Sequence, residues 1–470
     1  MISSSNFLSD DKGTFKSFAN GFLPSVAVIP VQSECKNTSV LVEVGDAVSE
    51  GQVVAKSDSF VVHSSIPGKV IDISTEQLAD GKQGTVVRIR LCGEFSFLGK
   101  PNVARDWRAL DSSHLTELFR DYGIVNTFEK CAPLYSQVKS SKAKVLFVRL
   151  FDDDPSRVSE SFIAEKSSEK VIEGSAILAR TMGVSGVVFA YEKNVAAIRK
   201  IYELLDEKSS DLYGRFSPLF DDIKIMTVPV DSKKYPSGTM KNLISAAKVN
   251  ARSFSKKMPE YAAVFSKTSL KDMFVDSQTV ESIYDAVVFR RPVMNRFVHV
   301  TGEALNAAAI LNVKIGTTLR QLVEQCGGLK KRLAKIVING TVLGYSVGSI
   351  DIPVMKMVKS VEFIPDYQSS DEHTEVCVRC GLCRKICPAH LWPGNIYRAT
   401  KLAQRGESQD SEYEKAVIDS AHLCIDCGLC NSVCPSRIPI RQTIDFAKKE
   451  LLSENSGSSS ESEDMIEYEI

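Results

Sequence analysis

Over the first hundred positions, apolar residues alternate with polar ones in short runs that glycine-bearing turns separate. Val26–Val31 and Val44–Ala55 are runs of this kind. Alternation with a period of two predicts half-buried β-strands, and the glycines predict the turns between them. Pro30 marks the first run as an edge strand or a strand end. The pattern predicts a small β-domain over residues 25–98, after a weakly patterned lead-in over residues 1–24.

Beyond residue 98 the pattern changes to strand-length apolar runs that alternate with helical periodicity. Strands are predicted at 144–148, 186–191 and 223–228, and a helix is predicted at 168–182. This alternation predicts a parallel sheet covered by helices, so we assign residues 99–290 to one Rossmann-like α/β domain.

A further helix is predicted after Asn194, which is a suitable N-cap for it. Val195, Ile198, Ile201 and Leu205 would share one face of this helix. Neither a G-x-G-x-x-G nor a G-x-x-x-x-G-K-[ST] motif occurs in the domain, so no nucleotide-binding fingerprint is present.

Residues 291–365 have the pattern of a third module, similar to a ubiquitin-like β-grasp fold of the SLBB type. Strands are predicted at 297–302, 311–314 and 335–340. A short helix should open at Gly316–Leu319 and end at the glycine pair 327–328.

Eight of the twelve cysteines form two copies of one spacing, C-x2-C-x2-C-x3-C-P, within residues 366–452. This is the ligand run of a bacterial ferredoxin that holds two [4Fe–4S] clusters, in which the fourth cysteine of each run ligates the other cluster. We therefore predict a helical two-cluster ferredoxin domain. The metal ligands are assigned to the first cluster as Cys377, Cys380, Cys383 and Cys434, and to the second as Cys424, Cys427, Cys430 and Cys387.

Structural zinc and disulfides are the alternatives for these cysteines. Zinc sites use pairs of C-x2-C and need neither a third evenly spaced thiolate nor a following proline. A disulfide framework is typical of short secreted chains, whereas this chain has 470 residues and no signal-peptide pattern at its start. The spacing favours iron–sulfur clusters.

Bulk composition describes ordinary soluble domains, with 43% hydrophobic and 25% charged residues. Lys and Arg total 58, as do Asp and Glu, and no basic run is interleaved with aromatics. A nucleic-acid partner is therefore not expected. No apolar run approaches the length of roughly 20 residues that spans a bilayer. The serine-rich, acidic segment 453–470 is expected to be disordered.

The N-terminal β-domain is similar to the barrel-sandwich hybrid of biotinyl and lipoyl domains. Those domains present a modifiable lysine at a hairpin tip, but the matching stretch Ser57–His63 contains none, and Lys56 lacks the surrounding motif. This domain is therefore expected to be a scaffold, with His63 packed or at the surface rather than acting as a ligand.

The order barrel-sandwich hybrid, α/β domain, β-grasp and two-cluster ferredoxin resembles the C subunit of Rnf ion-translocating oxidoreductases. Short sequence motifs similar to those of these C subunits occur at Gly21–Pro24, Val44–Asp46, Tyr235–Gly238 and Gly316–Thr317, and in both cysteine runs. The resemblance implies a peripheral subunit of a membrane complex. That complex would couple electron transfer, between ferredoxin and NAD or a comparable pair, to Na⁺ or H⁺ movement.

One departure concerns flavin. The resemblance implies a loop of the form G-x-G-G-A-x-F-P, whose glycines let backbone N–H groups approach flavin phosphate and NADH. Here the equivalent stretch is Gly123–Pro133, which has no glycine after Gly123, and Phe128, Glu129 and Lys130 would fill the space. In two further motifs that the resemblance implies, Arg149 stands in place of an asparagine and Thr239 stands in place of a glutamate. The middle domain thus resembles the A subunit of Na⁺-translocating NADH:quinone reductases, and neither FMN nor NADH is expected to bind.

These observations predict an electron-transfer subunit of an Rnf- or Nqr-type translocase, on the cytoplasmic side of the inner membrane. Its partners would be membrane subunits and ferredoxin or another electron donor, and no catalytic residue is assigned. The alternatives are a soluble dehydrogenase that feeds its own clusters from NADH through flavin, and a docking scaffold. Arg379, Arg384 and Lys385 in the first run, against Asp426 in the second, suggest the hypothesis that the first cluster is the better electron acceptor.

Overall fold

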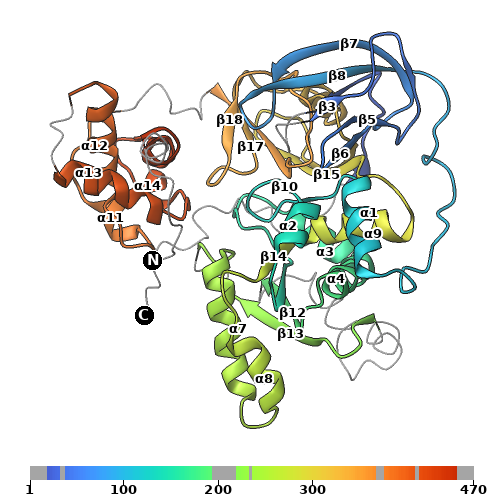
Figure 1. The fold of residues 1–470 in the computed structure, drawn as a ribbon. Helices are drawn as coiled ribbons and strands as arrows, with labels where there is room; N and C mark the ends of the chain where they lie inside the picture. Colours follow the sequence, from blue (N-terminus) through green and yellow to red (C-terminus); the bar gives the residue numbers. More distant parts are fainter. Residues whose placement is uncertain are drawn as a thin grey trace. The chain divides into compact units, whose positions relative to one another are not determined.

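The computed structural model describes residues 18–31, 38–192, 219–231, 235–366, 375–407 and 412–451. The chain forms two compact units, one ending at Tyr367 and one beginning at Gln368 (Figure 1). The first unit holds three modules and the second holds both cysteine runs.

The first module consists of two small antiparallel sheets that share one apolar core. One sheet has the order β2 (Val26–Pro30), β8 (Gln83–Leu91), β7 (Gly68–Gln77) and β4 (Ala47–Val48). The other has the order β3 (Ser39–Val40), β5 (Val53–Lys56) and β6 (Val61–His63). The core side chains that both sheets supply include Ile29, Val54, Phe60 and Ile89. This arrangement confirms the predicted barrel-sandwich hybrid.

A four-stranded parallel sheet forms the centre of the second module. Its order is β13 (Lys224–Val230), β12 (Gly186–Glu192), β11 (Val145–Arg149) and β14 (Met273–Asp276). The apolar run of β11 is buried on both faces because helices cover the sheet on either side. The predicted strands of this domain are therefore present.

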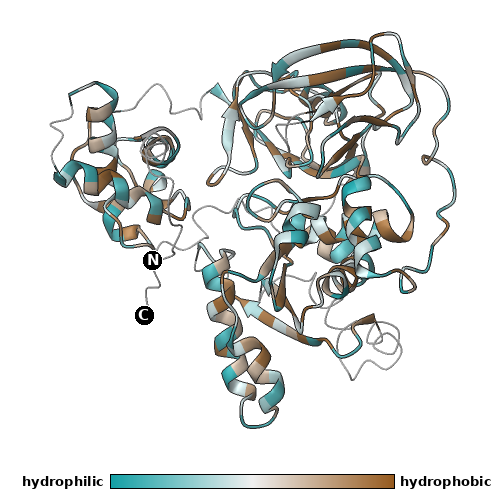
Figure 2. Ribbon diagram, in the orientation of Figure 1, coloured by the Kyte–Doolittle hydropathy of each residue, from teal (hydrophilic) through white to brown (hydrophobic). Residues whose placement is uncertain are grey.

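Helices on both faces of the sheet and one small hairpin complete the described part of this module. One face of the sheet is covered by α1 (Ser112–Asp121), α3 (Ser159–Lys166), α4 (Ser168–Met182) and α9 (Ser277–Val288). The other face is covered by α7 (Met240–Phe254) and α8 (Pro259–Ser266). Figure 2 shows apolar and polar residues mixed along α7 and α8, as expected of helices with one buried face. The hairpin of β9 (Val125–Asn126) and β10 (Ala132–Pro133) precedes α2 (Leu134–Ser140).

The third module is a six-stranded sheet with one helix against it. Its order is β1 (Phe18–Asn20), β16 (Ala309–Lys314), β15 (Asn295–Thr301), β19 (Ser360–Pro365), β17 (Leu333–Ile338) and β18 (Tyr345–Val347). Helix α10 (Leu319–Gln325) begins with a capping box between Thr318 and Gln321. Strand β1 comes from the stretch that we assigned to the lead-in, and it pairs in parallel with β16.

Buried polar contacts join the β-grasp module to the barrel-sandwich module. Lys314 Nζ of the β-grasp module lies 2.7 Å from Glu50 Oε1 of the barrel-sandwich module. Ser65 Oγ donates to the Ile315 carbonyl at 2.6 Å. Gly316 adopts φ +91°, and a Cβ there would meet the Val28 carbonyl at 2.9 Å. The turn therefore requires glycine for both its backbone conformation and its close approach.

Strand β6, which follows the hairpin tip of the barrel-sandwich module, is packed inside this unit, whereas Asp58 at the tip is exposed. His63 is buried, and Lys356 Nζ sits 4.3 Å from the Phe60 ring centroid and donates to the Gly123 carbonyl at 2.7 Å. A Cβ at Gly123 would clash with the Val61 carbonyl. Strand β6 is thus held against the start of the Gly123–Pro133 loop.

The second unit consists of short helices around an apolar core. These are α11 (Leu382–Ile386), α12 (Pro393–Gln404), α13 (Glu412–Asp419), α14 (Leu429–Ser432) and α15 (Ile440–Phe446). Ile396, Ile438 and Ile444 are buried between them. A 3₁₀ turn (Ser420–Leu423) leads into the second cysteine run, and a π turn (Ala447–Leu451) follows α15.

Two expectations fall on residues outside the described ranges. The helix predicted around Asn194–Leu205 is one, and the acidic segment 453–470 is the other. Within the described ranges, no helix has both the length and the apolar character needed to cross a membrane.

The burial of His63 predicts a loss of stability in mild acid. Burial, reinforced by the Lys356 ammonium, lowers the pKa of His63 to about 3. Between that value and the ordinary pKa near 6.5, the unfolded chain binds more protons, so stability falls as pH drops through this window. At pH 5 the cost is about 2 kcal/mol.

Chemical denaturation at pH 7 and pH 5 checks this prediction. The His63→Gln variant should lose about 2 kcal/mol less than the parent chain between the two values. His114→Gln, at an exposed histidine of helix α1, is the matched control. Equal pH dependence of the parent chain and His63→Gln would contradict it.

Candidate metal centre

The two cysteine runs share one backbone conformation. Two residues after the first cysteine the chain turns left-handed, with φ 52° at Arg379 and 56° at Asp426. It does so again at the glycine that follows the second cysteine, with φ 74° at Gly381 and 72° at Gly428. Left-handed conformations at non-glycine residues are uncommon. Their recurrence at matching positions shows that the runs are structural repeats as well as sequence repeats.

This conformation turns backbone N–H groups toward the sulfur atoms. The N–H groups of Asp426, Leu429 and Asn431 donate to the thiols of Cys424, Cys427 and Cys430, respectively. In the first run, the N–H of Leu391 donates to Cys387 Sγ at 3.4 Å. Successive N–H groups aimed at one place form an anion-binding concavity. Such groups stabilise thiolates and tune the clusters that thiolates hold.

Four cysteines from both runs line one cavity. It is lined by Cys387, Cys424, Cys427 and Cys430, among apolar side chains that include Leu391, Ile425 and Ile444. In the described part of the chain, no three His, Cys, Asp or Glu side chains are grouped to hold a single metal ion. The thiols instead surround a space. Their number, chemistry and shared cavity fit a [4Fe–4S] cluster, with Cys387 contributed by the other run.

The remaining cysteines of the two runs do not line this cavity. Cys377 and Cys380 lie near enough to Cys383 for their charges to raise the pKa of its thiol, after burial, which is the larger cause. A Cβ at Gly394 would come 3.3 Å from Cys383 Sγ, so the start of α12 closes over this thiol. Cys434 is half-buried in the same core.

The two sets of thiols differ in exposure. Cys377 and Cys380 are exposed, whereas Cys427 and Cys430 are buried. Burial raises the pKa of Cys427 to about 11 and that of Cys430 to about 12. Surroundings that disfavour a thiolate also disfavour an added electron, because both place negative charge in a medium of low polarity. Exposure thus supports the hypothesis that the first cluster is the better acceptor.

The charges beside the runs differ less than the sequence suggested. Lys448 Nζ lies 2.7 Å from Asp426 Oδ2 and donates to the Cys424 carbonyl at 2.7 Å, so a cation offsets the acidic residue of the second run. In the first run, the Arg384 guanidinium stacks 3.4 Å from the Trp392 ring centroid. Lys448 was not singled out from the sequence because it lies outside both cysteine runs, beyond the end of α15.

Side chains of the protein itself occupy the space beside the Gly123–Pro133 loop. Phe128 is buried and packs against Phe274, with ring centroids 5.6 Å apart. The Arg149 guanidinium lies 4.1 Å from the Phe128 ring centroid, and its two terminal nitrogens donate to the carbonyls of Phe128 and Gly238, both at 2.9 Å. Glu129 and Lys130, which we also expected to fill this space, are exposed. Phe128 and Arg149 therefore occupy it.

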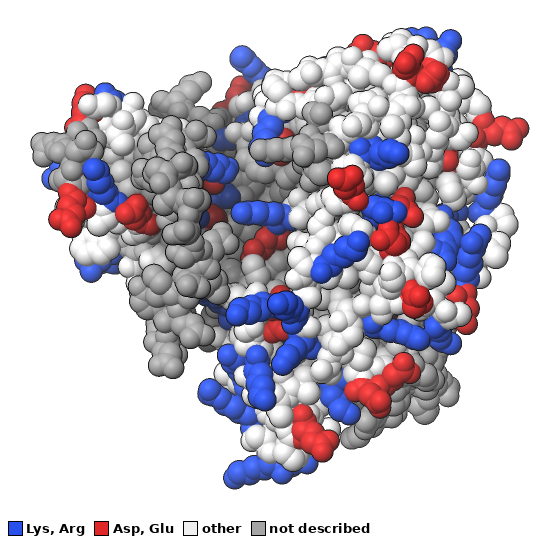
Figure 3. Space-filling view, in the orientation of Figure 1, with Lys and Arg blue, Asp and Glu red and all other residues white. Residues whose placement is uncertain are grey.

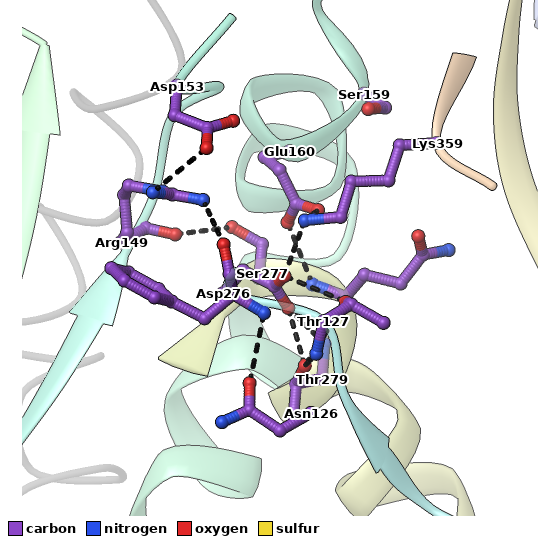
Figure 4. A network of polar contacts seen from close by, with 12 residues as sticks. Asn126, Thr127, Arg149, Asp153, Ser159, Glu160, Asp276, Ser277, Thr279 and Lys359 are labelled. Atoms are coloured by element: carbon purple, nitrogen blue, oxygen red, sulfur yellow. Dashed lines mark hydrogen bonds and ion pairs between the residues drawn. The ribbon is translucent and has the colours of Figure 1, made fainter. Parts of the chain in front are cut away.

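A network of buried charges lies beside this loop (Figure 4). Lys359 Nζ contacts Asp276 Oδ2 at 2.6 Å and Glu160 Oε1 at 3.0 Å. Thr127 Oγ1 donates to Asp276 at 2.8 Å. Burial opposes ionisation of Asp276, but the Lys359 ammonium and hydrogen bonds from Thr279 and Thr127 hold its pKa well below the usual range. The network ties the loop to the β-grasp module and to the start of α9.

Comparison with known families gives matches in three separate parts of the chain. The RnfC barrel sandwich hybrid domain matches residues 12–94, the SLBB domain residues 297–346, and the 4Fe-4S dicluster domain residues 373–438. These matches confirm the predicted fold class.

Two curated relatives align with most of the chain. The C subunit of the proton-translocating ferredoxin:NAD⁺ oxidoreductase complex of Clostridium ljungdahlii is 26% identical over 408 residues, which cover 84% of this chain and 82% of the relative. The C subunit of the Na⁺-translocating complex of Acetobacterium woodii is 24% identical over 401 residues, which cover 83% and 85%. The predicted resemblance to these C subunits is confirmed.

Among solved structures, a chain of an NAD⁺-reducing [NiFe]-hydrogenase superposes with a TM-score of 0.45 at 10% identity. The match covers 72% of this chain and 63% of that one. This likeness is too distant to carry an argument about function.

Paired substitutions test whether the fourth cysteine of each run crosses to the other cluster. If it does, Cys387→Ala with Cys427→Ala damages only the second cluster and leaves about four irons per chain. Cys387→Ala with Cys380→Ala damages both clusters and leaves almost none. Iron and sulfide analysis of anaerobically purified variants measures this. The reverse ranking of the two double variants would show that each run holds its own cluster.

The Lys448–Asp426 pair predicts a shift in the potential of the second cluster. Lys448→Met leaves Asp426 unneutralised beside Cys424, which should lower that potential by roughly 40 mV, the equivalent of about 1 kcal/mol for a one-electron couple. Lys449→Met is the matched control, because Lys449 pairs with Asp445 instead. Potentiometric titration followed by EPR measures both. A rise in potential, or equal shifts in the two variants, would contradict this role of Lys448.

Proposed function

We propose that this chain, a relative of the C subunits of ion-translocating oxidoreductases, is an iron–sulfur electron-transfer subunit of an Rnf-type membrane complex. The observation that carries this proposal is the pair of cysteine runs with matching left-handed turns and a cavity that both runs line. Two such clusters would each accept and release one electron at a time. The chain's own part is to hold them and to control their exposure and surrounding charge.

The ligand sets follow from the cavity and the repeat. We assign Cys424, Cys427, Cys430 and Cys387 to the second cluster, because these four thiols share the cavity. By the internal repeat, Cys377, Cys380, Cys383 and Cys434 hold the first cluster.

Exchange with an external electron carrier takes place at the first cluster in this proposal. Cys377 and Cys380 are exposed, and the neighbouring Val376 and Val378 are 84% and 66% exposed. Exposed apolar side chains beside a redox centre suit a transient protein contact. Ferredoxin or a comparable carrier is the expected partner, since the named relatives belong to ferredoxin:NAD⁺ oxidoreductase complexes.

The filled loop argues against the alternative of a flavin-dependent NADH dehydrogenase. A flavin phosphate site built on this loop would need free backbone N–H groups and open space. Phe128 and Arg149 occupy that space instead, and Arg149 is 1% exposed. We therefore propose that FMN and NADH do not bind here, and that the middle domain is a scaffold similar to that of quinone-reductase A subunits.

The domain division remains that derived from the sequence, with the barrel-sandwich hybrid over 25–98, the α/β domain over 99–290, the β-grasp domain over 291–365 and the ferredoxin domain over 366–452. In this proposal the chain sits on the cytoplasmic side of the membrane as a peripheral subunit. Membrane subunits of the complex are its further partners.

Anaerobic purification of the full chain tests the proposal. We expect about eight irons and eight sulfides per chain, and no flavin released on denaturation. The clusters should bleach with dithionite but not with NADH. The dithionite step is the internal control, because it shows that the clusters can be reduced. Stoichiometric flavin with NADH-dependent bleaching would instead support the dehydrogenase.

A further inference from the structure

Helices α7 and α8 and the turn after them carry a concentrated positive charge. We call residues 240–271 the basic hairpin. It contains one acidic residue, Glu260, and seven cations, although the whole chain is neutral with 58 of each sign. The cations are Lys241, Lys248, Arg252, Lys256, Lys257, Lys267 and Lys271. Figure 3 shows Lys and Arg side chains gathered over this part of the molecule.

The first helix of the hairpin separates its cations from its buried face. Lys241, Lys248 and Arg252 are seven and then four residues apart, a spacing that places them on one face of α7. Leu243 and Ala247 on the other face are buried against the sheet. None of the seven cations forms an ion pair with another residue in the described ranges. Their charge is therefore not neutralised within the described fold.

Large apolar side chains are exposed among these cations. Met258 follows Lys256 and Lys257 at the connection between the helices and is 49% exposed. Val249 on α7 is 64% exposed, and Leu270, next to Lys271, is 50% exposed. Exposed apolar side chains thus accompany the cations of the basic hairpin.

The basic hairpin contacts strands β12 and β13 where these strands begin. The buried charge network lies where strands β11 and β14 end. Tyr261 Oη donates to the Ile225 carbonyl at 2.9 Å, near the start of β13. A Cβ at Gly186, the first residue of β12, would lie 2.8 Å from the Phe265 ring. Arg149 and Asp276 instead end their strands. The connection between α7 and α8 therefore lies at the other end of the sheet from the buried charge network and from the Gly123–Pro133 loop.

We propose that the basic hairpin is the surface by which this chain contacts the anionic headgroups of a lipid bilayer. The cations would lie among lipid phosphates, while Met258, Val249 and Leu270 would enter the boundary between headgroups and acyl chains. Six of the seven cations are Lys, a residue that is depleted in protein–protein interfaces, whereas Arg and aromatic residues are enriched there. The composition thus favours a lipid surface over an acidic protein.

This inference draws its biological setting from the proposed function, but its test does not depend on the clusters. The full chain is mixed with vesicles of phosphatidylglycerol and phosphatidylcholine, and separately with phosphatidylcholine alone, and bound protein is measured by sedimentation. We expect binding to the anionic vesicles only, weakening as salt rises. The triple variant Arg252→Glu, Lys256→Glu, Lys257→Glu should bind at least on the order of 100-fold more weakly.

A matched triple variant removes the same charge elsewhere. Lys82, Lys100 and Lys330 are exposed on other elements, and their replacement by Glu should weaken binding far less. Circular dichroism checks that both triple variants fold. Met258→Ser should weaken binding without changing its dependence on salt, because it removes apolar contact alone.

Three results would overturn the inference: no binding of the parent chain to anionic vesicles, equal losses in the two triple variants, or unchanged vesicle binding with weaker assembly onto the membrane subunits in detergent. The last would make the basic hairpin a protein-docking site. Iron content and dithionite reduction are measured on the same samples. A chain that binds vesicles but holds no clusters would contradict the proposed function and leave this inference standing.

Discussion

The contact of Lys359 with Asp276 and Glu160 is the interaction on which the first compact unit depends. It is almost completely buried, and it joins the β-grasp module to the end of strand β14 and to helix α3. Asp276 also accepts from the backbone N–H of Thr279 at 2.9 Å, so the same carboxylate caps α9. Removing one partner from a buried ion pair typically costs about 3–5 kcal/mol, because the remaining charge has no compensation. This group of residues therefore fixes the relative placement of two modules and of the Gly123–Pro133 loop.

The second compact unit follows a different constraint, the need to bring eight sulfur atoms around two centres with very little chain. Its helices are short, and the apolar core between them is small. Backbone turns, rather than side-chain packing, aim the N–H groups at the thiols. Bound clusters would contribute to the stability of this unit, since metal binding and folding are coupled where ligands meet only in the folded chain.

Together these two features separate the roles within the chain. The first unit resembles relatives in its fold, but its loop is closed by Phe128 and Arg149. The second unit keeps every cysteine that two clusters require. The chain thus combines a unit that carries both cysteine runs with a larger unit that supplies surfaces such as the basic hairpin.

Sequence reasoning predicted the features that depend on local pattern. The helix over 168–182 has the predicted bounds because its amphipathic spacing ends at Gly183, whose left-handed φ of 63° closes it. The cysteine ligands were assigned from spacing alone, and that assignment stays a prediction. The charge network was not predicted, because Thr127, Glu160, Asp276 and Lys359 are far apart in the sequence and only the fold brings them together.

Two further features escaped prediction for the same reason. Strand β1 pairs with a strand almost 300 residues away, and its own three residues carry no strand pattern. The pairing of Lys448 with Asp426 depends on how α15 and the π turn after it return to the second cysteine run.

The central claim is that the two clusters are the redox centres of this chain. The most direct measurement is anaerobic coulometric titration of the purified full chain, which counts the electrons taken up from the fully oxidised to the fully reduced state. The account predicts about two electrons per chain, one for each cluster. An uptake near four, with the extra pair removed by NAD⁺, would reveal a bound flavin and contradict the account.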